Sequence, residues 1–151
     1  MSGETDLIKL YSARILELAA DIPRHGRLES PDATVKRRSP LCGSTVTVDI
    51  KVSDGRVSGY AADVKACALG QAAASIVGAN IIGCTQDQVI AARDALKSML
   101  KQDGPVPDAP FDGLEVLLPA RDYKNRHESI LLTLNASVEA MAEISAASSC
   151  A

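Results

Sequence analysis

The sequence has no tryptophan and one phenylalanine, and aromatic residues make up only 3 % of its 151 residues. A chain this poor in aromatic rings offers few platforms on which nucleic-acid bases could stack. Basic residues are not in excess either: the net charge is −3, and the only basic cluster is Lys36-Arg37-Arg38. Because nucleic-acid binding depends on Lys and Arg that neutralise phosphates, we expect no nucleic-acid partner.

Several localisation and catalytic signals are missing as well. The N-terminal sequence MSGETDLIKLYSARI lacks the basic start and unbroken apolar stretch of a secretory signal, so we expect a cytoplasmic protein. The one long weakly polar run, residues 66–84, is interrupted by Gln71, Ser75 and Asn80, which favours a buried helix over a membrane span. The sequence contains no G-x-S-x-G motif, so this signal of a hydrolase is missing. The four cysteines contain no C-x-x-C pair, which removes the strongest zinc-ribbon and thioredoxin signals.

What remains is an ordinary globular composition, with 46 % hydrophobic and 23 % charged residues. A chain of 151 residues is long enough to bury one sizeable core and too short for two. We therefore expect residues 1–151 to form a single domain, with a core from about residue 7 to residue 144. The small polar residues 145–151 predict a mobile tail.

The pattern of apolar residues predicts helices around a small sheet. Residues 44–52, STVTVDIKV, alternate like a half-buried strand, and Ser53-Asp54-Gly55 is a turn that leads into a returning strand. Apolar residues at helical spacing and a T-x-x-Q capping box that begins at Thr85 predict the helices. The predicted strands are about 34–38, 44–52 and 56–64, and the predicted helices are 5–20, 68–82, 86–101, a short one within 111–118, and 125–144. This order predicts an α+β fold, a small antiparallel three-stranded sheet with helices packed on one face.

Two cysteines flank the predicted hairpin. Cys42 precedes its first strand and Cys67 follows its second, and antiparallel pairing brings those two ends to the same edge of the sheet. We therefore expect the two thiols to lie close together. In a cytosolic chain such thiols are reduced or bind metal rather than form disulfides. The apolar stripe of the last helix, extended backwards, reaches His127, and Glu128 lies about 100° further round the helix.

These motifs, taken in order, resemble the U-type iron-sulfur cluster scaffold proteins, the IscU/NifU/SufU family. The segment from Ser39 to Val77 contains a Cys-Gly before the hairpin and a cysteine at the head of a small-residue helix. His127-Glu128-Ser129-Ile130-Leu131 resembles the family's His-Cys-Ser-Ile-Leu segment, and Tyr11 with Pro23-Arg24-His25-Gly26 resembles its N-terminal signature. The resemblance covers about residues 7–142. It implies a non-enzymatic scaffold that carries a [2Fe-2S] cluster and works with a cysteine desulfurase and with chaperone or carrier proteins.

The sequence departs from that family at three places. Ser44 stands where the family has an aspartate, and Glu128 stands where it has its third cysteine. With a different family spacing, Ser129 replaces that cysteine instead. The chaperone-binding Leu-Pro-Pro-Val-Lys segment of part of the family corresponds to Leu118-Pro119-Ala120-Arg121, followed by extra residues.

These losses change the expected chemistry. Iron-sulfur clusters prefer soft thiolate ligands, whereas imidazole and carboxylate are harder. Cys42, Cys67, His127 and Glu128 together could still hold Zn²⁺ or Fe²⁺ in a tetrahedral site. The family's third cysteine resembles the receiver of sulfur from the desulfurase, and a glutamate forms no persulfide. We therefore expect no sulfur reception at position 128, and any cluster that the chain carries is made elsewhere or made differently.

Each candidate residue also has a purely structural interpretation. Glu128 fits position N3 of a helix capped by Asn125, and His127 fits a hydrogen-bonded residue at the edge of the core. Cys84 is interpreted as structural, and Cys150 lies in the predicted tail.

The sequence therefore leaves three candidate functions. The first is a scaffold that binds a cluster or a single iron or zinc ion. The second is a related module that kept the fold and lost the cluster, and the third is a redox enzyme with a Cys42/Cys67 dithiol.

Overall fold

The structure is a computed structural model that describes residues 12–41 and 43–150, with only the backbone of residues 148–150. Strands β1 (Ala33–Arg38), β2 (Thr45–Ser53) and β3 (Arg56–Lys65) form an antiparallel sheet in the order β1-β2-β3. Asp54 and Gly55 make the turn between β2 and β3 with φ angles of 54° and 76°. Both residues of this two-residue turn need a left-handed backbone, which explains why Asp-Gly predicts it. The predicted sheet is confirmed.

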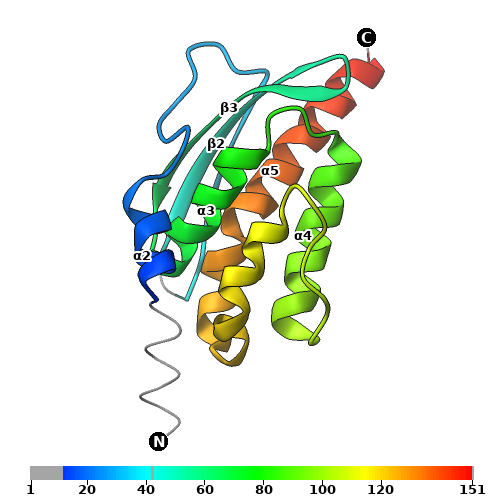
Figure 1. Cartoon of the computed structure of the whole chain (residues 1–151). Helices are drawn as coiled ribbons and strands as arrows, with labels where there is room; N and C mark the ends of the chain where they lie inside the picture. The colour runs from blue at the N-terminus through cyan, green and yellow to red at the C-terminus, as the bar shows by residue number, and fades with distance from the viewer. Residues whose placement is uncertain (1–11, 42, 151) are drawn as a thin grey trace, which may run out of the picture.

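Helices cover one face of this sheet. Figure 1 shows α3 (Ala68–Asn80) and α5 (Lys124–Cys150) against the strands, with α4 (Gln86–Lys101) on the far side of α5. The helix α2 (Ala13–Ala20) packs on α3, and a 3₁₀ helix, η1 (Asp112–Asp122), contacts α4 and α5. The α+β fold with helices on one face of a three-stranded sheet is therefore confirmed.

Helix boundaries differ from the sequence prediction in instructive ways. Thr85 forms the predicted capping box with Gln88, and α4 begins and ends as expected. By contrast, α5 begins at Lys124 rather than at Asn125 and continues to Cys150, well past the predicted end at residue 144. Of the predicted first helix, residues 5–11 lie outside the described residues, as does Tyr11, and residues 13–20 are helical with Ser12 as N-cap. The single-domain prediction stays a prediction.

The apolar side chains of β2 form the floor of the core. Val46, Val48 and Ile50 are at most 1 % exposed and lie on the face of β2 that packs against α5. The run of Ala and Gly in α3, predicted to be a buried helix, is buried as expected. By length and composition, Lys124–Ala147 of α5 could cross a membrane. However, half of an apolar 18-residue stretch within it is buried, and core helices of soluble proteins often have the same character.

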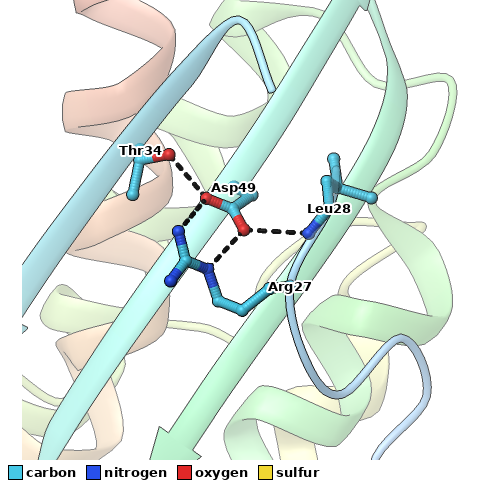
Figure 2. Close-up of polar contacts among 4 residues, drawn as sticks. All are labelled: Arg27, Leu28, Thr34 and Asp49. Atoms are coloured by element: carbon cyan, nitrogen blue, oxygen red, sulfur yellow. Dashed lines mark hydrogen bonds and ion pairs between the residues drawn. The ribbon is translucent and has the colours of Figure 1, made fainter. Parts of the chain in front are cut away.

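The other face of the sheet is not simply open to solvent. Asp49 lies on that face and is fully buried, although the alternating pattern predicted a half-buried strand. Its carboxylate accepts hydrogen bonds from Arg27 Nε at 2.6 Å, Arg27 Nη2 at 3.2 Å, the Leu28 amide at 2.9 Å and Thr34 Oγ1 at 2.6 Å, as Figure 2 shows. The segment between α2 and β1 therefore crosses this face and is fixed to the centre of the sheet.

Candidate functional site

The cysteine end of the sheet is built by strand register. Thr45 at the start of β2 pairs with Lys65 at the end of β3, so the residues just before Thr45 lie beside those just after Lys65. Cys67 is the N-cap of α3 and is partly buried, and Ser44 is 4 % exposed. Cys42 lies outside the described residues, two positions before Ser44. The predicted convergence of Cys42 and Cys67 therefore stays a prediction.

The third part of the site comes from α5, and the residue involved is Ser129. Its Oγ lies 3.4 Å from Cys67 Sγ, and it donates a hydrogen bond of 3.1 Å to Ser44 Oγ. Ser129 is 1 % exposed, so this polar chain is closed off from solvent on the α5 side. The head of the final helix does meet the hairpin's cysteine edge, as the sequence predicted, but through Ser129.

A glycine makes this approach possible. A Cβ at Gly70, in the first turn of α3, would lie 2.6 Å from Ser129 Oγ and 3.1 Å from the Ser129 carbonyl oxygen. No real Cβ tolerates a distance of 2.6 Å, so a larger residue would turn Ser129 Oγ away from Cys67 or move α5 away from α3. Gly70 thus sets the spacing at which Ser129 reaches Cys67.

His127 is buried but faces a different neighbour. It is 1 % exposed, and its Nε2 lies 3.0 Å from the Ala120 carbonyl and 3.1 Å from the Arg121 carbonyl at the end of η1. Because a carbonyl oxygen only accepts, Nε2 carries the proton in these contacts. Nδ1 is buried and has no hydrogen-bond partner among the described residues. One ring nitrogen is thus engaged with the backbone, and the other is not.

Glu128 faces α4. Its carboxylate lies 3.7 Å from Lys101 Nζ, and its side chain is 45 % exposed. The capping alternative required a helix that starts after Asn125, whereas α5 starts at Lys124, so Glu128 is two residues further into the helix than N3. Ser129 contacts Cys67, and His127 lies about 200° round the helix from Ser129. The structure therefore brings neither His127 nor Glu128 into contact with Cys67, and both remain predicted ligands that are engaged elsewhere.

No group of three or more His, Cys, Asp and Glu residues within ranges 12–41 and 43–150 could hold a metal ion. Cys42 lies outside these ranges. Cys84 is 3 % exposed and donates from Sγ to the Asn80 carbonyl at 3.4 Å, and burial raises the pKa of its thiol. These features fit the structural role predicted for Cys84. The side chain of Cys150 lies outside what the structure describes.

Sequence reasoning left the choice between Glu128 and Ser129 open, since two family spacings gave two alignments. The contact between Ser129 and Cys67 favours the spacing that aligns Ser129 with the missing cysteine. The hydrogen bond between Ser44 and Ser129 was not predicted at all. The only signal for it was that both positions differ from the family's metal-site residues.

Known proteins with this fold identify the family. The family model of the NifU-like N terminal domain matches residues 10–128. The crystal structure of a nitrogen-fixing NifU-like protein (N-terminal) from Brucella abortus is 47 % identical, with a TM-score of 0.91 over 93 % of this chain and 97 % of that one.

Two curated relatives, both iron-sulfur cluster assembly scaffold proteins IscU, are more distant. The protein from Thermotoga maritima is 23 % identical over 90 % of this chain and 95 % of its own length. The protein from Streptococcus pyogenes is 23 % identical over 87 % of this chain and 82 % of its own length. With the three-stranded sheet, the cysteine at the head of α3 and the contribution of α5, the matches agree: this chain belongs to the NifU-like N-terminal domain family, the U-type iron-sulfur cluster assembly scaffold proteins.

Proposed function

We propose that this protein is a cytoplasmic scaffold that carries a [2Fe-2S] cluster, or a single iron or zinc ion, on Cys42 and Cys67. The cluster or ion is its cargo, and the protein performs no turnover chemistry of its own. The observation that supports this most is the position of Cys67, at the N-terminus of a 13-residue helix and in contact with the head of α5. The positive end of a helix dipole favours the negative charge of a thiolate and its cargo.

The donors around Cys67 suit two-thiolate binding better than a full cysteine set. Ser44 and Ser129 offer hydroxyl oxygens, which are harder and weaker ligands for iron than sulfur. A hydroxyl is, however, a good hydrogen-bond donor to a thiolate. Ser129 could turn its one hydrogen from Ser44 Oγ to the Cys67 sulfur, 3.4 Å away, and hold that sulfur in place while Cys42 and Cys67 bind the metal. The remaining ligand positions then have to come from other groups.

His127 or Glu128 would complete the site after a change at the start of α5. His127 would have to turn from the carbonyls of Ala120 and Arg121, and Glu128 would have to leave Lys101. The Glu128–Lys101 contact is 3.7 Å long and partly exposed to solvent, so its loss costs little, about 0–1 kcal/mol. Nδ1 of His127 already lacks a partner among the described residues, which leaves one ring nitrogen for a metal.

Sulfur delivery has to differ from that of relatives with a third cysteine. Neither Glu128 nor Ser129 can form a persulfide, because neither has a sulfur atom. A cysteine desulfurase partner would therefore deliver sulfur to Cys42 or Cys67, or the chain would receive a finished cluster from another protein and pass it to a chaperone or carrier protein. Both routes keep the protein within iron-sulfur assembly.

The alternative is a relative that kept the fold and lost the cluster, and that acts by binding proteins of the same pathway. The contacts of His127 and Glu128 favour it, since both residues already have partners inside the protein. In that case Cys67 and Ser129 would be a buried polar contact only.

Anaerobic purification followed by iron, zinc and acid-labile sulfide analysis separates the two. We expect close to one bound ion, or one cluster, per chain, lost in Cys42→Ala and in Cys67→Ala. Cys84→Ala is the matched control, because it removes a buried thiol that donates to the Asn80 carbonyl. Metal far below one per chain in the unmodified protein, or equal metal in Cys67→Ala, would eliminate the scaffold proposal in favour of the alternative.

A further inference from the structure

The face of the sheet opposite the helices has two different halves. Strand register places its side chains in rows across the three strands. Arg38, Thr45 and Lys65 form the row at the cysteine end, and Lys36, Thr47 and Asp63 form the next. Thr34, Asp49 and Ala61 form the third row. Side chains on alternate residues share a face, so all of these point away from α3 and α5.

The third row is covered at Asp49 and Ala61, and the first two rows are more open. Arg27 and Leu28 bind Asp49 from above the sheet, and Figure 2 shows their segment over β3, with the Arg27 guanidinium reaching Asp49 on β2. Ala61 beneath that segment is 5 % exposed. In contrast, Lys36, Arg38 and Lys65 are exposed. The segment that fixes the middle of the sheet therefore leaves the end nearest the cysteines uncovered.

The open half carries cations without ion-pair partners among the described residues. The ion pairs that the structure shows involve none of Lys36, Arg38 and Lys65. The basic cluster seen in the sequence is split by strand alternation: Arg37 turns to the helix side and pairs with Glu139 of α5 at 2.8 Å, whereas its two neighbours face outward. Asp63 is the one acid in these two rows. It lies near Arg27 and raises the pKa of the Arg27 guanidinium, although less than Asp49 does.

This basic face lies next to the candidate site. A Cβ on Gly43 would lie 3.8 Å from Arg38 Nη2, so the guanidinium lies against the loop that contains Cys42. Lys65 is two residues before Cys67 in the chain. A protein that binds over these cations would therefore reach the edge where the cysteines lie.

We propose that the face formed by Lys36, Arg38 and Lys65 is a docking surface for an acidic surface of a partner protein. The whole chain has a net charge of −3, so three unpaired cations together are not a by-product of a basic composition. Strand spacing separates Arg38 from Lys65 by roughly 10 Å and Lys36 from Arg38 by roughly 7 Å. Carboxylates at i, i+4 and i+7 of a helix lie in one row about 10 Å long, which matches the separation of Arg38 and Lys65 across the sheet but not the whole triangle.

A protein partner fits this face better than a nucleic acid. Three cations would neutralise only three phosphates, and the face has no aromatic side chain on which a base could stack, since its rows contain only Thr, Ala and charged residues in the described strands. The inference goes beyond the proposed function, because charge complementarity here does not require Cys67 to hold a metal. It identifies where a partner approaches, not what is transferred.

The test uses a fluorescein-labelled helical peptide with glutamates at i, i+4 and i+7, and a matched peptide with glutamines there. Anisotropy is measured with the full-length protein, with Lys36→Glu/Arg38→Glu/Lys65→Glu, and with a control variant, Lys51→Glu/Lys97→Glu/Lys124→Glu. The control changes the same charge at exposed positions elsewhere, one of them on the same face. Circular dichroism and metal analysis of each variant show that the fold and the cargo are unchanged.

We expect the glutamate peptide to bind at low salt, and to bind about tenfold more weakly to the Lys36/Arg38/Lys65 variant than to the control variant, because three exposed ion pairs together account for roughly that factor. A peptide with lysines at the same positions should regain binding to the charge-reversed variant. Equal weakening in both variants, no rescue, or tighter binding of duplex DNA than of the peptide would overturn the proposal. A failure of metal binding alone would leave this result standing.

Discussion

Asp49 is the residue whose environment the fold controls most tightly. Its side chain is fully buried and accepts four hydrogen bonds, two of them from the Arg27 guanidinium. We predict that Asp49→Asn lowers the free energy of unfolding by roughly 2–4 kcal/mol, because a buried charged acceptor is removed while its donors stay in place. Urea denaturation near neutral pH measures the loss. Asp94→Asn, at an exposed carboxylate, is the control and should change stability by less than about 0.5 kcal/mol.

The same residue predicts a pH dependence. Burial alone would raise the pKa of Asp49, but the hydrogen bonds from Arg27, Thr34 and the Leu28 amide outweigh it and hold the pKa below its ordinary value. The group binds fewer protons in the folded state, so its stabilisation is present above about pH 4 and is lost as the pH falls through the folded pKa. The difference between native protein and Asp49→Asn should shrink below about pH 4. A constant difference down to pH 2 would contradict this assignment.

The position of the missing cysteine can be tested directly at Ser129 and Glu128. We predict that Ser129→Cys raises zinc affinity, because its side chain lies 3.4 Å from Cys67 Sγ, whereas Glu128→Cys faces Lys101 and does not. The expected gain is at least roughly 10–100-fold, since even an outer-shell partner contributes that much. Competition with a chromophoric zinc chelator under anaerobic conditions measures it. A larger gain in zinc affinity for Glu128→Cys would mean that position 128, and not position 129, corresponds to the family's third cysteine.

For single residues, the sequence predicted which elements meet better than it predicted which side chains contact each other. It predicted that Cys67 and the head of the last helix meet, because strand pairing and helical periodicity fix both. It could not predict that Asp49 is buried, since the covering residue Arg27 is 22 positions away and belongs to an irregular segment. Whether Glu128 occupies the capping position N3 depends on the first residue of α5, and helix boundaries are uncertain by one or two residues.

At the scale of elements, the contact between α3 and α5 depends on Gly70. We predict that Gly70→Ala destabilises the protein by about 1–3 kcal/mol, because its Cβ would meet Ser129 Oγ at 2.6 Å, and the resulting overpacking outweighs the higher helix propensity of alanine. Gly113→Ala is the matched control, since its Cβ would meet Ile76 at an ordinary 3.6 Å. Urea denaturation of both variants measures the difference in their free energies of unfolding. Equal stability of the two would mean that the Ser129 hydroxyl or α5 can give way at little cost.

Elements with a strong local signal were predicted almost to the residue. The β2–β3 hairpin follows from alternation and the Asp-Gly turn, and α4 follows from its capping box at Thr85. The 3₁₀ helix η1 was predicted only as a short helix, because Pro119 and mixed polarity give no clear period. The end of α5 was predicted too early, because its last residues have a small polar composition that is also typical of tails.

At the scale of the whole molecule, the candidate site joins three elements that are far apart in sequence. The loop before β2 contains Cys42 in its sequence and supplies Ser44. The residue before α3 is Cys67, and α5 supplies Ser129. Only the folded chain holds these groups together. A metal ion on Cys42 and Cys67 would therefore bind the folded state in preference to the unfolded one, and its binding free energy would add to the stability of the entire domain.

This coupling gives the last prediction. At a free zinc concentration 100 times the Kd, binding adds about 2.7 kcal/mol, which for a domain of this size raises Tm by roughly 5–10 °C over the same protein in EDTA. We expect the rise in native protein and in Cys84→Ala, and its absence in Cys42→Ala and Cys67→Ala, by calorimetry in a reducing buffer. Thiols of the unfolded chain also bind zinc and reduce the shift, which the cysteine variants measure separately. If Cys67→Ala kept the full rise in Tm, the ion would lie elsewhere in the protein.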